Sequence, residues 1–549
     1  MDRHRSGYCR SWLCSNQIPV KGICLICTFY NAGEEQIMGV VIGIDLGTTF
    51  SVGSWVDEHG DVHVAPSRDG GNTTPSVVEF DGDNIIVGKA AKASAEAQSD
   101  SVVQFVKRQM GNGKYRYYAP DDSEYTAEEI SAMILKRVKA DCEAAIGSPV
   151  TDAVITVPAY FESVQRQATI NAGIIAGLNV IDIINEPTAA AFAYTQGKED
   201  QAQTIMVYDI GGGTFDVTIL RIIPGGEIQV LASDGVKRLG GIDFDNALIN
   251  YASTKIKEDT GIDILEDDNA MQTLRAKCEQ AKIALSSASE ATISMTIQQK
   301  QVNVVVTKEK FEELTHRYVE MTEDPIDTVL SESGLSPSDL DKVLLVGGSS
   351  RIPAIRDFIF RKLHITPSAE LNPDEVVSIG AAYYGAKKKN PSFFSAGANT
   401  SSTSVPAKPP IRDVLAHGLG IISWDSDVGH DINNIIIPRN TPLPVKDGHV
   451  FSSMVDNQEI AAVRVTEGDE DDIDYVRIIG QEEVALRPHP KGSPIAIEMA
   501  ADENGIISVR ALDLLDKVVL KQFRLNAKET MSPEKLQQSA ERMNEQHIN

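Results

Sequence analysis

Two segments of the chain, residues 41–50 and 205–216, repeat a pattern of residues that suits phosphate chemistry. Each has an apolar run, then an aspartate (Asp45 or Asp209), and then a turn rich in glycine and threonine. Glycines in such a turn let backbone N–H groups approach a phosphate without a Cβ in the way. One copy alone would be an ordinary tight turn as readily as a binding loop. Two copies predict a duplicated domain pair that holds one nucleotide between its halves.

A third glycine-rich turn, Gly347-Gly348-Ser349-Ser350, follows an apolar run and can let an adenosine approach the backbone. The chain has no Walker-type G-x-x-x-x-G-K-[ST] motif. Asp45 and Asp209, at the tips of their predicted strands, can hold Mg²⁺ through its water ligands. Together the three turns predict a pocket for ATP or ADP with Mg²⁺.

The elements that position these turns alternate between strand and helix patterns from Val40 to about residue 389, which favours an α/β fold with largely buried sheets. Residues 390–410 are rich in Ser, Thr, Ala and Pro, a composition typical of a linker. Short alternating segments follow, with Asn504-Gly505 as a tight hairpin turn, and they predict an all-β region. One helix is predicted to begin near Ser532.

Size and charge exclude some classes of function. A chain of 549 residues is too long for one hydrophobic core, so several domains are expected. The net charge of −27 would repel phosphate backbones, which argues against nucleic acid as a partner. No apolar run is long enough to span a bilayer, which argues against a membrane protein. The six cysteines are sparse in the body of the chain, as expected for a protein of the reducing cytoplasm.

Residues 1–37 allow several interpretations. Met38 stands directly before the first predicted strand, so we favour an unstructured or mis-started extension with no structural role. A genuine tail is the first alternative. Cys24 and Cys27 form a C-x-x-C pair that can hold zinc with two upstream cysteines. A short apolar stretch after a lysine also resembles a signal peptide, although polar residues break it.

Five stretches of the chain resemble the ATPase domain of the heat-shock-70, or DnaK-type, chaperone family. They are residues 44–49 (IDLGTT), 156–161 (TVPAYF), 184–191 (INEPTAAA), 209–216 (DIGGGTFD) and 347–353 (GGSSRIP). The resemblance covers residues 40–389 and continues more weakly to about residue 525. It implies an actin-like, duplicated α/β ATPase domain of two lobes, followed by an all-β sandwich that binds peptide. The implied domains are an extension (1–37), the ATPase domain (38–389), a linker (390–413), the β-sandwich domain (414–525) and a truncated lid helix (526–549).

The same resemblance implies the roles of the catalytic residues. Asp45 and Asp209 match carboxylates around Mg²⁺, and Lys107 matches a lysine that reaches the phosphates and the attacking water. Glu186 matches a carboxylate that orients water and metal, and Thr214 lies against the γ-phosphate. These roles describe phosphoryl transfer by positioning and charge neutralisation. The implied nucleotide-binding residues, in which Thr48 also faces the γ-phosphate, are Gly47, Thr48, Thr49, Gly211, Gly212, Gly213, Glu279, Lys282, Ser286, Gly347, Gly348, Ser349, Arg351 and Asp374.

In the β region, residues 437–444 and 451–458 resemble strands and loops of the family's peptide groove. Binding there would be strand-like, with backbone hydrogen bonds giving affinity and pockets giving selectivity. Trp424 and Met454 would form an arch over a pocket that contains Ala461, where the family usually has a larger aliphatic residue. The alternative is that these residues simply belong to the core of a β sandwich. The implied lining is Ile421, Trp424, Phe451, Met454, Ala461, Val463 and Ile495.

Three departures from the family pattern concern the coupling of the two sites. The linker reads DVLAH at residues 413–417, without the family's leucine run and without the acid at its end. Asp182 stands where the family has an arginine used in J-domain and interdomain contacts, and this charge reversal would repel what an arginine attracts. The helical lid is cut short because the chain ends at Asn549. Pro158 and Arg166, which match the family's interdomain relay, are retained.

These features predict an ATP-hydrolysing chaperone that holds extended hydrophobic segments of unfolded polypeptides. The implied partners are such polypeptides, a nucleotide exchange factor, and a J-domain co-chaperone whose contact Asp182 disfavours. One alternative is a regulatory scaffold that binds ATP, rarely hydrolyses it and docks on a dedicated partner; the intact acid, lysine and threonine set argues against it. Another is a sugar kinase or filament-forming relative, against which the all-β C-terminal region argues.

Overall fold

The computed structural model describes residues 40–549 except residues 83, 199–200, 369, 391–410, 427 and 526–530. The described residues all belong to one compact unit, Gly39–Asn549. The alternatives for residues 1–37 therefore lie outside the described residues, as does most of the predicted linker 390–413. No helix in the described ranges is long and apolar enough to cross a membrane.

Two sheets share one strand pattern, as the paired glycine loops predict. In each sheet an antiparallel pair of strands carries a glycine loop at its turn, and a later strand lies parallel to the first of the pair. The first sheet has the order β11 (Asn179–Asn185), β10 (Asp152–Val157), β1 (Val41–Leu46), β2 (Phe50–Val56) and β3 (Val62–Val64), with β4 (Thr74–Pro75) also paired to β2. The second has the order β17 (Lys342–Val346), β12 (Gln203–Ile210), β13 (Phe215–Ile223), β14 (Glu227–Val236) and β18 (Ile411–Arg412).

Helices and small sheets complete residues 40–389, the ATPase region that the resemblance implies. The helices are α1 (Lys89–Ser94), α2 (Ala127–Ile146), α3 (Ser163–Ile175), α4 (Glu186–Thr195), α5 (Gly241–Thr260), α6 (Asp268–Leu285), α7 (Lys308–Glu320), α8 (Glu323–Ser333), α9 (Pro353–Leu363) and α10 (Val376–Lys389). The small sheets are β6 (Asn84–Val87), β5 (Val77–Asp81) and β7 (Val102–Gln104); β8 (Tyr117–Tyr118) and β9 (Glu124–Tyr125); and β15 (Glu290–Ile297) and β16 (Lys300–Thr307).

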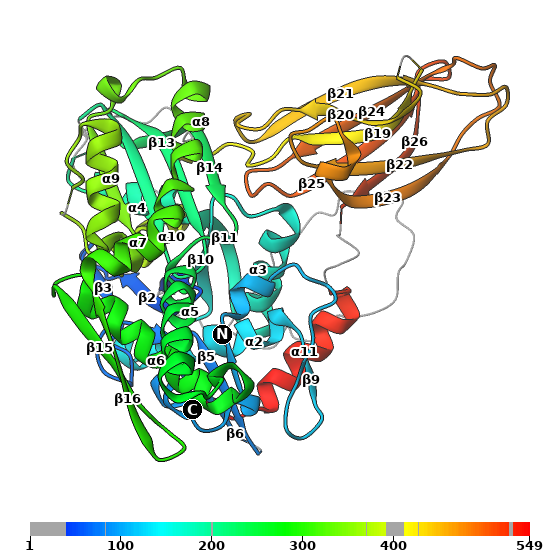
Figure 1. Cartoon of the computed structure of the whole chain (residues 1–549). Helices are drawn as coiled ribbons and strands as arrows, with labels where there is room; N and C mark the ends of the chain where they lie inside the picture. Colours follow the sequence, from blue (N-terminus) through cyan, green and yellow to red (C-terminus); the bar gives the residue numbers. More distant parts are fainter. Residues whose placement is uncertain are drawn as a thin grey trace, which may run out of the picture. The chain divides into compact units, whose positions relative to one another are not determined.

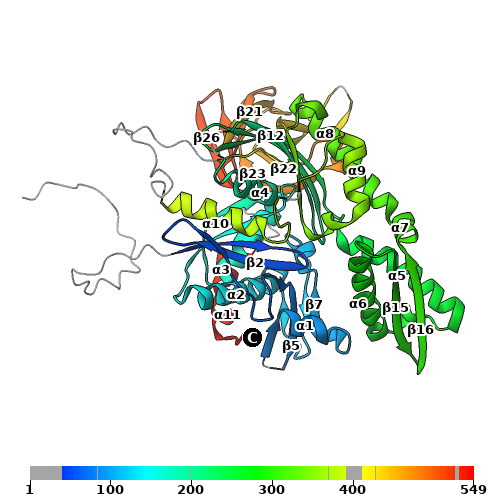
Figure 2. The same ribbon diagram turned by 90° about the vertical axis from the view of Figure 1, so that its left-hand side faces the viewer.

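Helix α10 packs against β1, β2 and β10 and also against α4, so it lies between the two sheets (Figure 2). Two glycines permit this close approach. A Cβ on Gly43 would come 2.1 Å from the backbone nitrogen of Ala382, and a Cβ on Gly380 would come 1.8 Å from the carbonyl oxygen of Ala189. Neither position has room for a larger residue, because the neighbouring atoms belong to the backbone.

The C-terminal region forms two antiparallel four-stranded sheets, drawn in yellow to orange in Figure 1. The first contains β20 (His430–Ile437), β19 (Leu419–Asp425), β22 (Ile460–Glu467) and β23 (Arg477–Ala485), and the second contains β21 (Val445–Ser452), β24 (Pro494–Ala501), β25 (Ile507–Asp513) and β26 (Val518–Arg524). Alternate residues of β25 are buried, as period-2 patterning requires. The predicted turn at Asn504-Gly505 joins β24 to β25, and Gly505 has a φ of 75° that favours glycine. The fold is therefore the predicted α/β region with two related sheets, followed by a β sandwich.

The last helix, α11 (Pro533–Glu545), begins after Ser532, whose side chain accepts a hydrogen bond from the backbone N–H of Lys535. It packs against α2 and α3 of the ATPase region (Figure 1). Met543 is 2% exposed within the first-lobe core, and Arg542 forms an ion pair with Glu129 at 2.7 Å. The helix predicted as a lid remnant thus lies on the ATPase region in this structure.

Candidate functional site

A cavity of about 430 Å³ brings the three predicted glycine turns together. Asp45 and Thr48 reach it from the first turn, Asp209 and Thr214 from the second, and Gly347 from the third. The other predicted site residues that line it are Gly47, Thr49, Lys107, Glu186, Gly211, Gly212, Glu279, Lys282, Ser286, Gly348, Ser349, Arg351 and Asp374. Three separate parts of the sequence therefore converge on one chamber of a size suited to a small-molecule ligand.

The first two turns meet face to face, and this contact explains two of their glycines. A Cβ on Gly212 would lie 2.4 Å from Thr49 Cγ2, and a Cβ on Gly213 would lie 2.6 Å from Thr48 Oγ1. Gly213 itself does not line the cavity, unlike the other predicted glycines. Its carbonyl oxygen instead accepts hydrogen bonds from the Arg108 guanidinium at 2.9 and 3.2 Å. Gly213 thus contributes to the contact between the two glycine turns.

Lys107 and Glu186 form an ion pair beside the turns, with Lys107 Nζ 2.6 Å from Glu186 Oε1. Lys107 lies in a short 3₁₀ turn, Val106–Gln109, and Glu186 is the first residue of α4. Their exposures are 6% and 7%, so both charges are held inside the cavity region. A buried lysine that has one carboxylate partner can also neutralise a phosphate placed beside it.

The acids of the cavity show an excess of buried negative charge. Burial and the neighbouring Glu186 raise the pKa of Asp45 to about 7. Burial and Glu186 also raise the pKa of Asp209 well above its usual value, and they raise the pKa of Asp216 to about 7. A divalent cation would relieve this repulsion, and carboxylate oxygens are ligands that Mg²⁺ accepts directly or through water. The residues present therefore fit Mg²⁺.

The far end of the cavity is lined by α6 and by side chains that pair with it. Lys282 donates to Asp245 at 2.8 Å and to the carbonyl oxygen of Gly241 at 3.1 Å. Glu279 forms an ion pair with Lys92 of α1 at 2.7 Å. Glu279 and Lys282 of α6 and Ser286, which directly follows the helix, are predicted nucleotide-binding residues, and all three line the cavity. Sequence reasoning missed other lining residues because no local motif marks them: Phe50, Lys92, Phe105, Asp245, Gln272 and Arg275.

The predicted groove residues fall into two groups in the sandwich. Ile421 and Val463 are 4% exposed and belong to its core, while Phe451 and Ile495 pair across β21 and β24 and are partly buried. Ala461 lies on β22, and Trp424 and Met454 are about half exposed, at 52% and 54%. Two exposed hydrophobic side chains beside a core are compatible with a groove, and the groove remains a prediction.

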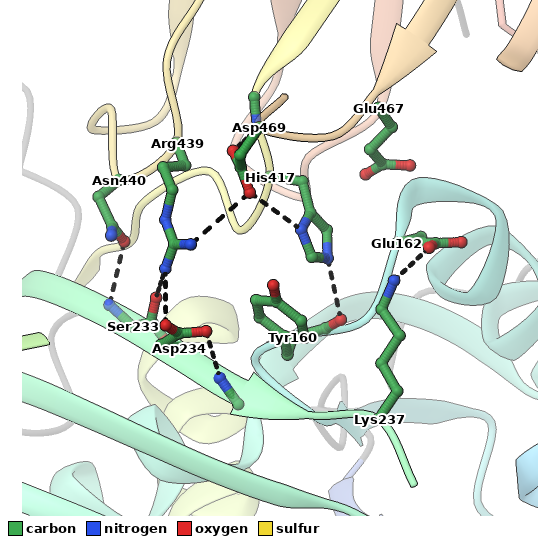
Figure 3. Close-up of polar contacts among 12 residues, drawn as sticks. Tyr160, Glu162, Ser233, Asp234, Lys237, His417, Arg439, Asn440, Glu467 and Asp469 are labelled. Atoms are coloured by element: carbon green, nitrogen blue, oxygen red, sulfur yellow. Dashed lines mark hydrogen bonds and ion pairs between the residues drawn. The ribbon is translucent and has the colours of Figure 1, made fainter. Parts of the chain in front are cut away.

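Polar contacts join the sandwich to the ATPase region (Figure 3). His417 Nε2 lies 3.3 Å from the carbonyl oxygen of Tyr160, and the two rings stack edge to face at 4.2 Å. The backbone N–H of Tyr160 donates to Asp216 in the second glycine segment at 2.9 Å. Figure 3 also shows Arg439 between Asp234 and Asp469, at 3.3 and 3.6 Å. Tyr160 therefore links a phosphate turn to the β domain through its own backbone.

A second contact lies nearby, in the part of Figure 3 that shows Glu467 and Glu162. The carboxylate of Glu467 accepts hydrogen bonds from the backbone N–H of Ser163 at 3.1 Å and from its hydroxyl at 3.0 Å. Glu162 pairs with Lys237 and with Arg477 of the sandwich. Burial raises the pKa of Glu467 above its usual value.

The predicted linker ends at Asp413, a buried acid whose Oδ2 accepts a hydrogen bond from Asn185 at 2.8 Å. Asn185 also accepts from Arg166 at 2.6 Å. Just before Asp413, β18 adds to the edge of β14. A linker without a leucine run can thus still attach to the ATPase region. It does so through the pairing of β18 with β14 and through the buried hydrogen bonds that join Asp413, Asn185 and Arg166.

The structure corrects what we expected of Asp182. We expected its charge to repel partners, but the residue is only 4% exposed. Its carboxylate accepts a hydrogen bond from the Tyr384 hydroxyl at 2.6 Å and pairs with Lys388. Both partners lie on α10, so the negative charge is neutralised within the ATPase region and does not face a partner.

The family model described as "Hsp70 protein" matches residues 41–118 and 114–549. The chaperone protein DnaK of Thermotoga neapolitana is 41% identical over 485 residues, which are 86% of this chain and 78% of the relative. The DnaK of Thermosipho melanesiensis is 40% identical over 483 residues, with the same two coverages. The match includes the glycine turns, the lysine and the β sandwich described above. The chain therefore belongs to the Hsp70 family of ATP-dependent chaperones.

Proposed function

We propose that this chaperone hydrolyses Mg²⁺-bound ATP in the cavity between the two glycine turns and holds extended hydrophobic peptide on the sandwich. Lys107 neutralises charge on the phosphates, and the hydroxyls of Thr48 and Thr214 contact the terminal phosphate. Asp45, Asp209 and Glu186 hold Mg²⁺ and the attacking water. When bound, Mg²⁺ neutralises charge on the phosphate oxygens. The protein supplies positions and charges that are fixed before the reaction begins.

The observation that carries the proposal, by connecting its two sites, is that the backbone of Tyr160 forms hydrogen bonds to both regions of the protein. Its N–H is bonded to Asp216 beside the phosphate turn, and its carbonyl oxygen is bonded to His417 of the β domain. A change at the γ-phosphate that moves Asp216 therefore moves the backbone that His417 contacts. This connection supports coupling of hydrolysis to peptide binding, despite the unusual linker.

Single-turnover hydrolysis of ATP, measured with and without an unstructured hydrophobic peptide, tests the proposal. We expect hydrolysis in both cases and faster hydrolysis with peptide. The scaffold alternative predicts tight ATP binding with negligible turnover under both conditions. If peptide does not change the rate of turnover, the ATPase site and the peptide site are uncoupled, and the proposed coupling is wrong.

The partners proposed are unfolded polypeptides, a nucleotide exchange factor and a J-domain co-chaperone, and the cytoplasm is the proposed compartment. Because Asp182 is buried and paired with Lys388, it offers no free charge to a J-domain. A J-domain partner would have to use other groups near α3 and β11. Binding of a J-domain that Asp182→Arg strengthens would show that this position still takes part.

A further inference from the structure

Three side chains with metal-binding atoms converge at one end of the β sandwich. His489 lies in the segment between β23 and β24, Asp513 is the last residue of β25, and Asp516 lies in the turn before β26. His489 Nε2 is 2.9 Å from Asp513 Oδ2 and 3.5 Å from Asp516 Oδ2. All three ligand atoms lie within 4.8 Å of one another. In the described part of the chain, no other set of three His, Cys, Asp or Glu side chains comes this close together.

Asp513 is fixed in place before any metal binds. Its side chain is 4% exposed, and Oδ1 accepts hydrogen bonds from the backbone N–H groups of Leu515 at 2.9 Å and Asp516 at 3.0 Å. Oδ2 is thereby turned toward His489. A carboxylate oriented in this way by outer hydrogen bonds is typical of metal ligands.

The donor types and their spacing fit zinc. One imidazole nitrogen and two carboxylate oxygens are common zinc ligands, and in a tetrahedral site such atoms lie roughly 3.3 Å apart. The observed separations of 2.9 and 3.5 Å lie on either side of that value. Calcium and magnesium prefer shells of oxygen only, so the imidazole disfavours them. We propose that His489, Asp513 and Asp516 bind a zinc ion, with water in the remaining position.

The simpler interpretation is a hydrogen-bonded histidine and aspartate that only stabilise the turn. Asp516 has another partner, because Arg487 Nη1 lies 2.9 Å from Asp516 Oδ2. The Arg487 side chain is 52% exposed, and exposed ion pairs contribute little free energy, so zinc can displace it. Zinc binding by His489 separates the two interpretations directly.

The site connects to the predicted peptide groove by hydrogen bonds. The carbonyl oxygen of His489 accepts from the backbone N–H of Asn457 at 2.7 Å. The backbone N–H of Lys491, two residues after His489, donates to the Asp456 carboxylate at 2.7 Å. The segment 453–457 carries Met454, one side of the predicted arch. Zinc would join the β25–β26 turn to this segment, and we infer that it slows the release of bound peptide. This consequence depends on the proposed function of the sandwich.

Isothermal titration of the full chain with Zn²⁺ tests the site, with excess Mg²⁺ present and nucleotide absent. The four cysteines at positions 9, 14, 24 and 27 are changed to serine in every protein, because they can bind zinc themselves. We expect one zinc per chain. His489→Ala and the isosteric Asp516→Asn should each bind at least about tenfold more weakly, since changing even an outer-shell partner costs that much. His430→Ala, an exposed histidine of the same domain, should bind like the parent. Equal zinc affinity in the parent and in both site variants would overturn the proposal.

A peptide release experiment tests the consequence separately. Dissociation of a labelled extended peptide should be slower with zinc than with a chelator in the parent, and equal under both conditions in His489→Ala. If zinc binds as expected but release does not change, the link to the groove is wrong and the metal site stands. If no peptide binds to any protein, the proposed function of the sandwich fails, while the titration still decides the zinc site.

Discussion

The ammonium group of Lys107 and the carboxylate of Glu186 lie 2.6 Å apart although 79 residues separate them in sequence. Each is more than 90% buried, and each contacts the cavity that the glycine turns enclose. A buried pair of this kind is costly unless it is compensated, because both groups lose their hydration. Because further acidic and basic side chains, among them Asp45 and Asp209, line the same cavity, phosphate chemistry explains this buried pair better than stability does.

Lys107→Ala is expected to slow single-turnover ATP hydrolysis roughly 10²–10³-fold, the usual cost of removing one preorganised charge. The fold should remain, because the alanine removes a partner of Glu186 at the edge of a cavity that water can enter. Rapid quench measures the rate. Lys114→Ala, an exposed lysine in a nearby loop, is the matched control and should hydrolyse normally. Normal turnover in Lys107→Ala would remove Lys107 from the catalytic set.

Glu467→Ala is expected to abolish stimulation of hydrolysis by peptide while basal hydrolysis stays near the parent rate. The reason is that Ser163 would lose the partner of its N–H and hydroxyl at the junction, and an unpaired buried group costs about 1–3 kcal/mol. Steady-state hydrolysis with and without peptide gives the ratio. Glu470→Ala, whose side chain is exposed, should keep the ratio of the parent. Full stimulation in Glu467→Ala would mean that this contact does not transmit the signal.

Contact between the two domains is expected to strengthen as the pH falls through the raised pKa of Glu467 toward the ordinary glutamate value of about 4.3. Burial raises the pKa of Glu467 and of Asp413 in the docked arrangement. A carboxyl with a raised pKa binds its proton more tightly when docked, so its contribution is present at low pH and is lost as the pH rises through that pKa. Energy transfer between dyes on the two domains would measure docking.

Two other acids limit how far the domain contact strengthens as the pH falls. Burial raises the pKa of Glu162 and of Asp469, but Lys237 and Arg477 around Glu162 and the His417 contact of Asp469 bring both values below normal. These two therefore weaken docking only at more acidic pH. Glu467→Gln should flatten the pH response above the ordinary glutamate pKa of about 4.3. A Glu467→Gln protein with the parent's pH response would assign the effect to another group.

Ala461→Val is expected to weaken binding of peptides with a bulky central residue at least about fivefold, because overfilling a packed pocket costs about 1 kcal/mol or more. Peptides with a small central residue should bind as before. Fluorescence titration measures both, since Trp424 is 52% exposed at the predicted arch and should respond to peptide. Trp424→Phe assigns the signal among the three tryptophans of the chain. An unchanged Trp424 emission together with unchanged affinities would exclude this groove.

The convergence of the three glycine turns on one cavity could be predicted from the sequence because their key groups lie in local turns. Glycine and threonine beside an aspartate have a meaning that does not depend on the rest of the fold, and two copies imply two lobes. The partners that depend on distant packing could not be found in this way. Asp182 is neutralised by Lys388, 206 residues later, only because α10 packs against β11, the edge strand of the first sheet. The burial of Asp413 likewise depends on the pairing of β18 with β14.

The bonds of Tyr160 also determine what mutagenesis can reveal. The groups that connect Asp216 to His417 are its main-chain N–H and carbonyl oxygen, which almost every amino acid possesses. Replacing the aromatic ring by alanine removes the stacking on His417 but leaves this main-chain connection available. Proline is the exception, since it has no N–H to donate to Asp216. A scan that replaces side chains one at a time would therefore undervalue position 160, and variation of its residue type among natural sequences would carry little information about its importance.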